Sequence, residues 1–375
     1  MQDLGRPIFI SEIEQLGGAE RSLLALSSWL HERGLPHYLL TYADHCDVAQ
    51  YAAHPVTVKD LKTGTGVRRK VAALKSHFAE RTGSLPALAS GYQEALHLTL
   101  AGVRGFHDLM HDTPSLFGDQ ERRDLKARVR IAISSAIVGY GLRSGGTTIV
   151  TSEYLKGECR KDFGVEAQIV RMGGLATGVE AKVAREIVRG GPLRMLSVCR
   201  IEANKRIDWL LRALHTLEQS AEAPLTGRLS ELVDWHLDLA GKGSLIAELT
   251  QLAQTLGIAD RVHFHGFVSD EDLDRLYAAA DLFLMPAVQG YGIPAIEALE
   301  RGLPVLLHRE SGVSDILLDT PWATVLSGGE EGAAAALVRA IAALLDGGYR
   351  NVPRPELPTE AEWAGRVAEL CGWTG

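Results

Sequence analysis

The chain has 375 residues, of which 46% are hydrophobic and 23% charged, and its net charge is −8. These values are typical of a globular protein with two or three domains and exclude a disordered chain or a disulfide-stabilised miniprotein. The negative charge gives no reason to expect a nucleic-acid partner. The charge is unevenly divided, since residues 1–190 carry 24 basic and 21 acidic side chains, whereas residues 191–375 carry 15 and 26. Two halves of different charge predict two domains with different partners.

The cysteines and the amino terminus predict a reducing compartment. Cys46, Cys159, Cys199 and Cys371 are far apart and form no CxxC pair, so neither a disulfide framework nor a zinc site is indicated. The first ten residues lack a signal-peptide pattern, and no segment reaches the roughly 20 apolar residues of a membrane span. We therefore expect a cytoplasmic protein.

In the first half of the chain, short strand-like runs alternate with longer helical segments. The expected strands are Pro7–Ser11, His37–Tyr42, Val56–Leu61 and Thr147–Thr151. The expected helices are Ala19–Arg33, Val67–Arg81 and Glu153–Phe163. This alternation is typical of a parallel sheet with helices on both faces.

The same pattern restarts after the turn-forming segment Arg189–Pro192. The expected strands are Leu193–Cys199, Trp235–Ala240, Arg261–Phe264, Asp281–Met285 and Pro304–Leu307. The expected helices are Arg206–Leu217, Leu245–Leu256, Glu271–Ala279, Pro294–Arg301, Gly332–Leu345 and Glu360–Cys371. We predict an α/β fold with two Rossmann-like, doubly wound domains, residues 1–190 and 191–357, whose facing sheet edges form a cleft. We expect residues 358–375 to cross back to the first domain.

The segment Gln289–Glu297 follows an expected strand and leads into a helix. Gly290 and Gly292 allow the backbone to approach a ligand, and Pro294 suits the first helical turn. The free amides and the dipole at this helix start favour a phosphate, and Glu297 is placed to accept hydrogen bonds from sugar hydroxyls. The alternative is a plain glycine turn whose glutamate stabilises its own helix.

Two cations, Arg200 and Lys205, follow the end of the strand Leu193–Cys199. Arginine binds phosphate in a bidentate manner and lysine acts as a point charge, so the pair suits a diphosphate. Arg206 is expected to be solvated. The alternative is that all three are ordinary surface cations.

These residues have a family likeness. The segments Arg200–Lys205, Gly241–Ser244, His265–Val268, Gly290–Leu299 and Gly302–Val305 resemble, in order and spacing, the retaining glycosyltransferases of family 4. In the first half, Gly17–Arg21 is similar to the glycine loop of that family, and Thr151–Leu155 to its closing strand and helix. The resemblance is most specific in Cys199–Pro304 and looser in Val56–Gly146.

The resemblance implies a GT-B fold and a hexosyl transfer, with retention, from a nucleotide diphosphate sugar to a hydroxyl acceptor in glycan, glycolipid or polysaccharide biosynthesis. A UDP- or GDP-sugar donor and a glycan or lipid-linked acceptor are expected, with no cofactor and no metal. The catalytic residues implied are Arg200, Lys205, His111 and Gln289. The nucleotide-sugar-binding residues implied are Gly17, Gly18, Phe267, Val268, Gly290, Tyr291, Gly292, Ile293 and Glu297.

Gln289 departs from the family pattern, which usually has two glutamates separated by seven residues. An amide can still hydrogen-bond to a sugar, but it cannot act as a carboxylate nucleophile. Two alternatives follow: a weak or inactive nucleotide-sugar-binding partner subunit, or a nucleotide-sugar epimerase on the same fold. A nicotinamide dehydrogenase is disfavoured, because no G-x-G-x-x-G follows the first strand.

Three further patterns have a functional and a structural interpretation. His111 resembles the family histidine that contacts the donor sugar, whereas His107 is expected in the core; no third ligand supports a metal pair. Asp270-Glu-Asp272 matches a metal-binding Asp-x-Asp, but Ser269 as N-cap favours helix-end electrostatics. The basic stretches Arg68–Lys70 and Arg122–Arg130 suit peripheral contact with the inner membrane face, or are solvated helix faces.

Overall fold

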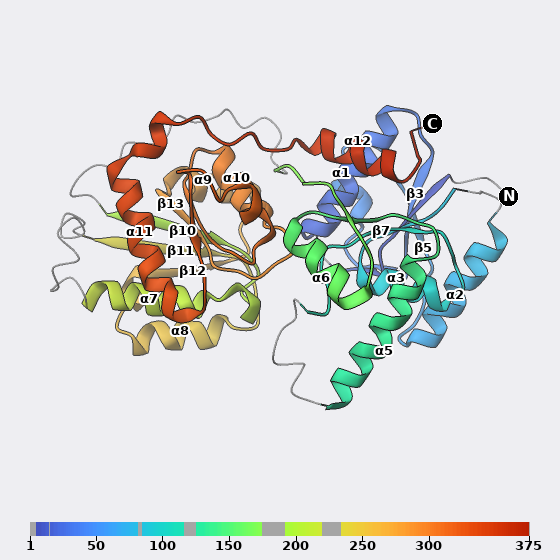
Figure 1. Cartoon of the computed structure of the whole chain (residues 1–375), viewed down its shortest axis with the longest axis horizontal. Helices are drawn as coiled ribbons and strands as arrows, with labels where there is room; N and C mark the ends of the chain where they lie inside the picture. Colours follow the sequence, from blue (N-terminus) through green and yellow to red (C-terminus); the bar gives the residue numbers. More distant parts are fainter. Residues whose placement is uncertain are drawn as a thin grey trace. The chain divides into compact units, whose positions relative to one another are not determined.

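The protein is described here by a computed structural model covering residues 5–14, 16–81, 85–115, 125–174, 192–219 and 234–374. The chain divides into two compact units, Met1–Leu175 with Pro358–Gly375, and Ala176–Leu357. The boundary expected after residue 190 lies outside the described residues. Each unit is an α/β domain built on a parallel sheet (Figure 1).

The sheet of the first unit contains, in its described part, strands in the order β5-β3-β1-β6-β7-β8-β9, all paired in parallel. The interior strand β1 is buried, with Ile8 and Phe9 inaccessible to solvent, as expected for a strand covered on both faces. A small parallel pair, β2 with β4, lies outside this sheet. The bounds are β1 Arg6–Phe9, β2 Glu12–Ile13, β3 His37–Thr41, β4 Ala43–Asp44, β5 Thr57–Asp60, β6 Leu88–Ala89, β7 His107–Leu109, β8 Thr148–Val150 and β9 Gln168–Ile169.

The first unit contains α3 (Tyr92–Leu100), which was not predicted from the sequence, and α5 (Leu125–Leu142), which was expected only as one interpretation of the basic stretch up to Arg130. These two helices pack against each other. The others are α1 Gly18–Glu32, α2 Val67–Glu80, α6 Glu153–Phe163 and α12 Glu360–Leu370. None of the described helices is both long and apolar enough to cross a membrane.

The terminal helix α12 is separated by most of the chain from α1, yet the two pack together. A Cβ atom at Gly365 would lie 3.2 Å from the ring of Trp29, so glycine permits this close approach. Trp363 is 1% exposed, and Arg6 Nη2 donates a hydrogen bond to the carbonyl oxygen of Trp373 at 3.1 Å. Thr359 begins the helix with a capping box closed by Glu362, which specifies where the segment becomes helical.

The sheet of the second unit has the order β12-β11-β10-β13-β14-β15, again with parallel pairings among its described strands. The chain reverses direction across the sheet between β10 and β13, and ligands of such sheets bind beyond the carboxyl ends of the strands at this switch point. The last strand, β15, was not predicted from the sequence. The bounds are β10 Leu193–Val198, β11 Trp235–Ala240, β12 Val262–Gly266, β13 Leu282–Met285, β14 Val305–His308 and β15 Ala323–Leu326.

Helices α7 and α8 cover one face of this sheet, and α9 and α10 cover the other (Figure 1). The helix α7 begins at Ile207, one residue later than predicted, because Arg206 has a positive φ of 54° that a right-handed helix does not accept. Lys205 therefore lies in a separate 3₁₀ turn, Ala203–Lys205. The bounds are α7 Ile207–Gln219, α8 Ile246–Thr255, α9 Asp270–Ala279, α10 Ile293–Glu300 and α11 Ala333–Asp346.

Candidate functional site

The loops that follow β10 and β11 pack closely at the carboxyl edge of the second sheet. A Cβ atom at Gly241 would lie 1.9 Å from the carbonyl oxygen of Cys199, and one at Gly243 would lie 2.1 Å from that of Ile201. The amide of Gly241 also donates to the carbonyl of Gly266, at the end of β12, at 2.7 Å. The glycines of the segment Gly241–Ser244 are therefore required, because the ends of β10, β11 and β12 approach one another closely there.

Arg200 and Lys205 both lie at this edge, directly after β10. Arg200 is exposed, and the segment between the two cations is held by Glu202, whose carboxylate accepts hydrogen bonds from the amide and hydroxyl of Ser244 at 3.0 and 2.6 Å. These bonds lower the pKa of Glu202. Burial raises the pKa of the Cys199 thiol, and the positive charges of Lys205 and Arg200 oppose that shift. The electrostatic fields of Arg200 and Lys205 thus both reach the Cys199 thiol, at the end of β10.

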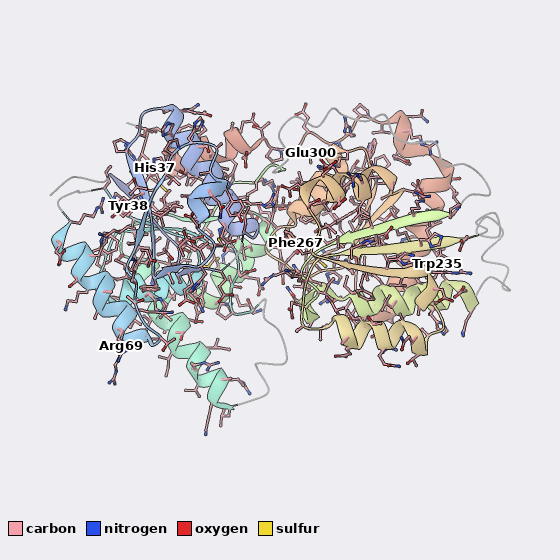
Figure 2. All side chains as sticks on the ribbon, turned by 180° about the vertical axis from the view of Figure 1, so that it is seen from behind. His37, Tyr38, Arg69, Trp235, Phe267 and Glu300 are labelled. Atoms are coloured by element: carbon pink, nitrogen blue, oxygen red, sulfur yellow. The ribbon has the colours of Figure 1, made fainter. Side chains whose placement is uncertain are left out.

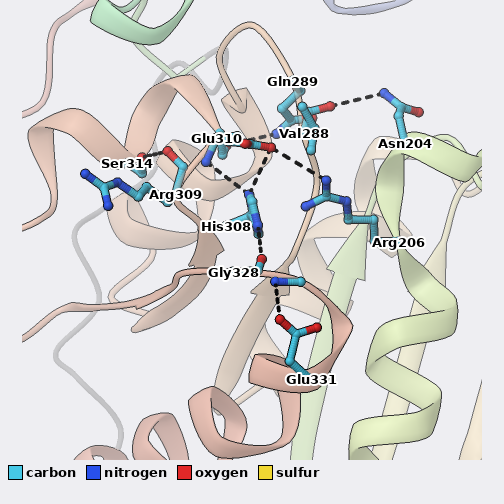
Figure 3. Close-up of polar contacts among 12 residues, drawn as sticks. Asn204, Arg206, Val288, Gln289, His308, Arg309, Glu310, Ser314, Gly328 and Glu331 are labelled. Carbon is cyan, nitrogen blue, oxygen red and sulfur yellow. Dashed lines mark hydrogen bonds and ion pairs between the residues drawn. The ribbon is translucent and has the colours of Figure 1, made fainter. Parts of the chain in front are cut away.

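Lys205 reaches across to the loop that follows β13. Its Nζ donates to Gln289 Oε1 at 2.6 Å. The other end of the amide, Nε2, lies 2.9 Å from Met285 Sδ and 3.4 Å from Ser311 Oγ. The main chain of Gln289 is also tied to the next loop, since its amide donates to the carbonyl of Glu310 at 3.3 Å (Figure 3).

Arg206 is not solvated as expected. Its side chain is 21% exposed, its guanidinium lies 3.6 Å from the carboxylate of Glu310, and it stacks over the ring of Trp209 at 4.2 Å. The carboxylate and the electron-rich ring face both attract the cation, so this side chain is partly buried in spite of its charge. His308 completes this group: its Nδ1 accepts from the Glu310 amide at 3.0 Å, and its Nε2 donates to the carbonyl of Gly328 at 3.0 Å (Figure 3).

The predicted phosphate loop leads into the amino terminus of α10. Gly292 has a φ of +128°, and a Cβ atom there would lie 2.6 Å from Met285 Cε and 2.7 Å from Gln289 Nε2, so only glycine fits. Gly290 and Tyr291 are buried, and the carbonyl of Tyr291 accepts from Ser311 Oγ at 2.9 Å. Ile293 is the first residue of α10, where free amides and the helix dipole favour an anion.

Glu297, one turn into α10, has its carboxylate oriented by a tyrosine. Tyr277 Oη donates to Glu297 Oε2 at 3.1 Å and lies 3.2 Å from the carbonyl of Pro294. Burial and the neighbouring carboxylate raise the pKa of Tyr277, so its hydroxyl remains a donor at neutral pH. Arg301 lies over the tyrosine ring at 4.6 Å. The hydrogen bond from Tyr277 thus fixes the orientation of the Glu297 carboxylate, and Glu297 remains partly exposed to solvent.

Phe267 and Val268 follow β12 at the same edge of the sheet. Figure 2 shows Phe267 at the carboxyl ends of the strands and Trp235, the first residue of β11, toward their other ends. The ring of Phe267 is 75% exposed and Lys242 Nζ lies 5.1 Å above it, while Val268 is half-buried. An exposed aromatic face of this kind suits stacking against a nucleobase. The next residue, Ser269, accepts from the Asp272 amide at 3.1 Å, which confirms the predicted N-cap. No metal-binding acidic cluster occurs in the described residues.

The remaining predicted residues lie in the first unit. Gly17 is the N-cap of α1 and donates its amide to the Glu20 carboxylate at 3.0 Å, and Gly18 begins the helix. His111 follows β7 and is half-buried; burial lowers its pKa, and Asp112 opposes this. His107 is buried in β7, where its Nδ1 accepts from the Thr147 amide at 3.1 Å.

Ser311, Glu310 and Tyr277 were not predicted from the sequence as neighbours of these residues. Ser311 and Glu310 follow β14, the strand beside β13, and Tyr277 is the buried residue of α9. Ser311 could have been predicted as a loop residue near the site, because a serine and a glycine follow three residues after the buried strand β14. The signal at Tyr277 was weak, because a tyrosine at a helical core position is most often there for packing.

Residues 180–356 match the family model for glycosyl transferases group 1. A mannosyltransferase of Mycolicibacterium smegmatis, described as GDP-mannose-dependent alpha-(1-6)-phosphatidylinositol monomannoside mannosyltransferase, is 32% identical over 145 residues, which are 36% of this chain and 35% of the relative. D-inositol 3-phosphate glycosyltransferase 2 of Catenulispora acidiphila is 36% identical over 179 residues, 46% of this chain and 40% of the relative. The matched segments thus span well under half the length of these curated relatives.

Solved structures match nearly the whole chain. WaaG, a glycosyltransferase involved in lipopolysaccharide biosynthesis, has a TM-score of 0.68 at 19% identity, with 97% of this chain and 95% of that chain covered. Anabaena Alr3699/HepE in complex with UDP and glucose has a TM-score of 0.70 at 15% identity, with 98% and 99% covered. Residues 180–356 are thus similar to the group 1 glycosyl transferases, and the chain has the GT-B fold of two Rossmann-like domains.

Proposed function

We propose that the protein transfers a hexosyl group from a nucleotide diphosphate sugar to a hydroxyl acceptor, with retention at the anomeric carbon. One observation carries the proposal. The Lys205 ammonium reaches the Gln289–Gly292 loop at the switch point between β10 and β13, beside the amino terminus of α10. A cation and a helix start together form an anion site, and this site lies in the segment that matches the group 1 family.

In this proposal the second unit holds the donor. Arg200 and Lys205 stabilise the charge that develops on the departing diphosphate, and the amides of Gly290, Tyr291, Gly292 and Ile293 add hydrogen bonds. The carboxylate of Glu297, oriented by Tyr277, accepts the ribose hydroxyls. Phe267 and Val268 contact the base.

The residues of the first unit have proposed roles as well. Gly17 and Gly18 approach the diphosphate or the acceptor, and His111 contacts the donor sugar. The acceptor attacks from the face of the leaving group, and a phosphate oxygen takes its proton, so the reaction needs no carboxylate at position 289. Two fixed cations supply the positive charge that the diphosphate requires, and the reaction is proposed to need no cofactor or metal.

A UDP- or GDP-sugar is the proposed donor. The M. smegmatis relative is described as GDP-mannose-dependent, and Alr3699/HepE has been solved with UDP-glucose. The proposed acceptor is a glycan or a lipid-linked sugar, since the relatives include a phosphatidylinositol monomannoside mannosyltransferase and WaaG acts in lipopolysaccharide biosynthesis.

A thermal-shift screen of nucleoside diphosphates and their sugars tests the donor. A ligand at 100 times its Kd adds about 2.7 kcal/mol to the free energy of unfolding, so one base should stand out with a clear rise in Tm. The matching nucleosides, which lack phosphate, are the control and should give almost no shift. Absence of a shift with every diphosphate, together with absence of transfer, would contradict the proposal.

Product assays with the donor that this screen identifies separate the alternatives that Gln289 raises. Donor binding without transfer or hydrolysis against a broad acceptor panel favours a partner subunit that has lost turnover. Conversion of the donor sugar in the absence of an acceptor favours an epimerase. Transfer with retained anomeric configuration favours the proposed reaction, and the one-bond C1–H1 coupling of the product reports that configuration.

Peripheral contact with an anionic membrane is proposed for helix α5. Leu125, Val129 and Ile133 stand on successive turns and are 71%, 51% and 57% exposed, and together with Lys126 and Arg130 they line one groove. The described helix carries no acidic side chain, so its charge is complementary to anionic headgroups. Figure 1 shows the first half of α5 extending past the other helices of its unit.

The other basic stretch contributes less to this surface. Arg68 and Arg69 of α2 are exposed, and Figure 2 shows Arg69 pointing away from the helix. Lys70 instead pairs with Glu12 and lies 5.2 Å from the ring of Tyr42. Arg122 and Arg123 lie outside the described residues. The proposed membrane surface therefore rests on α5.

Replacing Val129 and Ile133 together by glutamate should abolish binding to anionic vesicles. Burial of each side chain is worth about 1.5–3 kcal/mol, and the new charges repel the lipid, so a loss of at least tenfold is expected. Sedimentation with phosphatidylglycerol vesicles measures binding, and phosphatidylcholine vesicles should bind little wild-type protein. Leu318→Glu, at a 55% exposed position in the second unit, is the matched control. Equal binding by all three proteins would contradict the proposed surface.

A further inference from the structure

Two acidic side chains are buried at the carboxyl edge of the first sheet, and we call them the acid pair. Asp108, in β7, is inaccessible to solvent, and Glu94, in the first turn of α3, is 7% exposed. Buried carboxylates in proteins are usually paired with a cation. In the described part of the chain, the hydrogen bonds to this pair come instead from neutral groups of Ser11 and Gly91.

The acid pair connects three segments of the first unit. Ser11, in the loop after β1, donates its amide to Glu94 Oε1 at 2.7 Å, and its hydroxyl donates to the same oxygen. Gly91, the N-cap of α3, donates its amide to Asp108 Oδ1 at 3.3 Å. The loop after β1 and the start of α3 are thus tied to each other by one carboxyl group, and α3 is tied to β7 by the other.

The second oxygen of Asp108, Oδ2, is buried and has no hydrogen-bond partner among the described residues. An ionised carboxylate in this place would lose its hydration without compensation, whereas a protonated carboxyl group is neutral and loses less. Burial, followed by the charge of Glu94, raises the pKa of Asp108 well above its ordinary value, and the Gly91 amide opposes this shift. Burial also raises the pKa of Glu94, against the hydrogen bonds from Ser11.

The titratable groups that act on the acid pair from other elements supply no positive charge. They are Glu20 of α1, Tyr42 after β3 and Cys159 of α6. Glu20 adds a negative charge that raises the pKa of Glu94 further. Burial and the acid pair raise the pKa values of Tyr42 and Cys159, so both side chains stay neutral.

The histidine of α3 is neutral as well. His97 lies three residues after Glu94, and its pKa is lowered to about 4, first by burial and then by the charge of Lys70. Lys70 itself forms its ion pair with Glu12. The acid pair is therefore a buried site of two carboxyl groups in which a bound proton takes the place of a cation.

We propose that Asp108 keeps its proton at neutral pH and acts as a proton-dependent latch, which holds the loop after β1 and the start of α3 against β7. When the proton passes to water, two negative charges share one buried site. The ionised state then favours an opened edge in which both carboxylates are hydrated. The latch goes beyond the proposed sugar transfer, and it lies beside His111, which follows β7.

The pH dependence of unfolding tests the latch. The folded unit holds a proton that the unfolded chain releases near the ordinary aspartate pKa of about 3.9, so stability falls as the pH rises from there to the raised pKa of the folded state. Asp108→Asn keeps the shape and the acceptor for Gly91 but cannot titrate. The ratio of the wild-type unfolding constant to that of this variant should therefore rise about tenfold per pH unit between pH 5 and pH 7.

Urea titration at each pH, monitored by hydrogen exchange of the α3 amides, measures these constants. Asp47→Asn is the matched control, because Asp47 is exposed in the same unit and has a φ of 52°, a conformation that asparagine tolerates. It should keep the wild-type pH dependence. Glu94→Gln removes the neighbouring charge and should flatten the dependence, as Asp108→Asn does.

Infrared difference spectroscopy at pH 7 detects the proton directly. Wild-type protein should show the C=O stretching band of a protonated carboxyl group, and Asp108→Asn should lack it. Absence of this band from wild type would overturn the inference. Equal pH dependence of wild type and Asp108→Asn would also overturn it, since a uniform loss of stability at every pH reports packing alone.

Discussion

Arg200→Ala and Lys205→Ala are each expected to slow sugar transfer by about 10²–10³, the usual effect of removing one preorganised group that stabilises a leaving group. Both cations lie at the end of β10, where their charges oppose the rise in the pKa of Cys199. The loss should fall mainly on kcat, because the negative charge on the diphosphate grows as the sugar departs. Initial rates with a saturating donor, identified by the thermal-shift screen, measure the effect.

A surface arginine provides the control for these variants. Arg275 is exposed, and among the described residues it pairs locally with Glu271 and Asp272 in the first turns of α9, so Arg275→Ala should transfer at the wild-type rate. The double variant of Arg200 and Lys205 should lose less than the product of the single losses, because both cations act on one diphosphate. Unchanged transfer by either single variant would refute its proposed catalytic role.

Trp363→Ala is expected to destabilise the first unit by about 3–5 kcal/mol, the usual cost of truncating a buried tryptophan to alanine. Trp363 is 1% exposed in α12, the helix that returns from the carboxyl terminus to pack on α1. The truncation therefore leaves a cavity beneath α12. This helix is connected along the chain to the rest of its unit through the whole of the second unit, so its packing is what holds it there. Urea titration, monitored by hydrogen exchange of the backbone amides in each unit, measures the free energy of unfolding of the two units separately.

Trp322→Ala is the matched control, because it truncates the same residue type in the second unit. Trp322 is 4% exposed, donates from Nε1 to the carbonyl of Val352 at 3.0 Å, and lies edge-on to Tyr349. It should lower the stability of the second unit and leave the exchange of α1 amides unchanged, the reverse of Trp363→Ala. Equal destabilisation of both units by Trp363→Ala would show that the terminal helix does not belong energetically to the first unit.

The elements that were predictable share a strong local pattern. The strands β10, β11 and β13 are buried hydrophobic runs bounded by turns, and α7 shows a clear apolar face through Leu210, Leu211 and Leu214. The helix α5 was foreseen only as one interpretation of the basic stretch up to Arg130. Its apolar residues fall on two faces, since Leu125 and Ile133 are exposed, whereas Val138 is buried. The strands β6 and β9 are two residues long, too short for a periodic signal.

What the sequence alone determined is the local chemistry of the second unit. A glycine loop before Pro294 and two cations after a buried strand predict an anion site, because backbone freedom, helix dipole and charge are properties of nearby residues. Only the tertiary structure decided which groups meet. Lys205 and Gln289 are 84 residues apart, and Arg206 and Glu310 are farther still. These pairs form because parallel pairing aligns the carboxyl ends of β10, β13 and β14 along one edge, and that alignment depends on strand order, which no local pattern encodes.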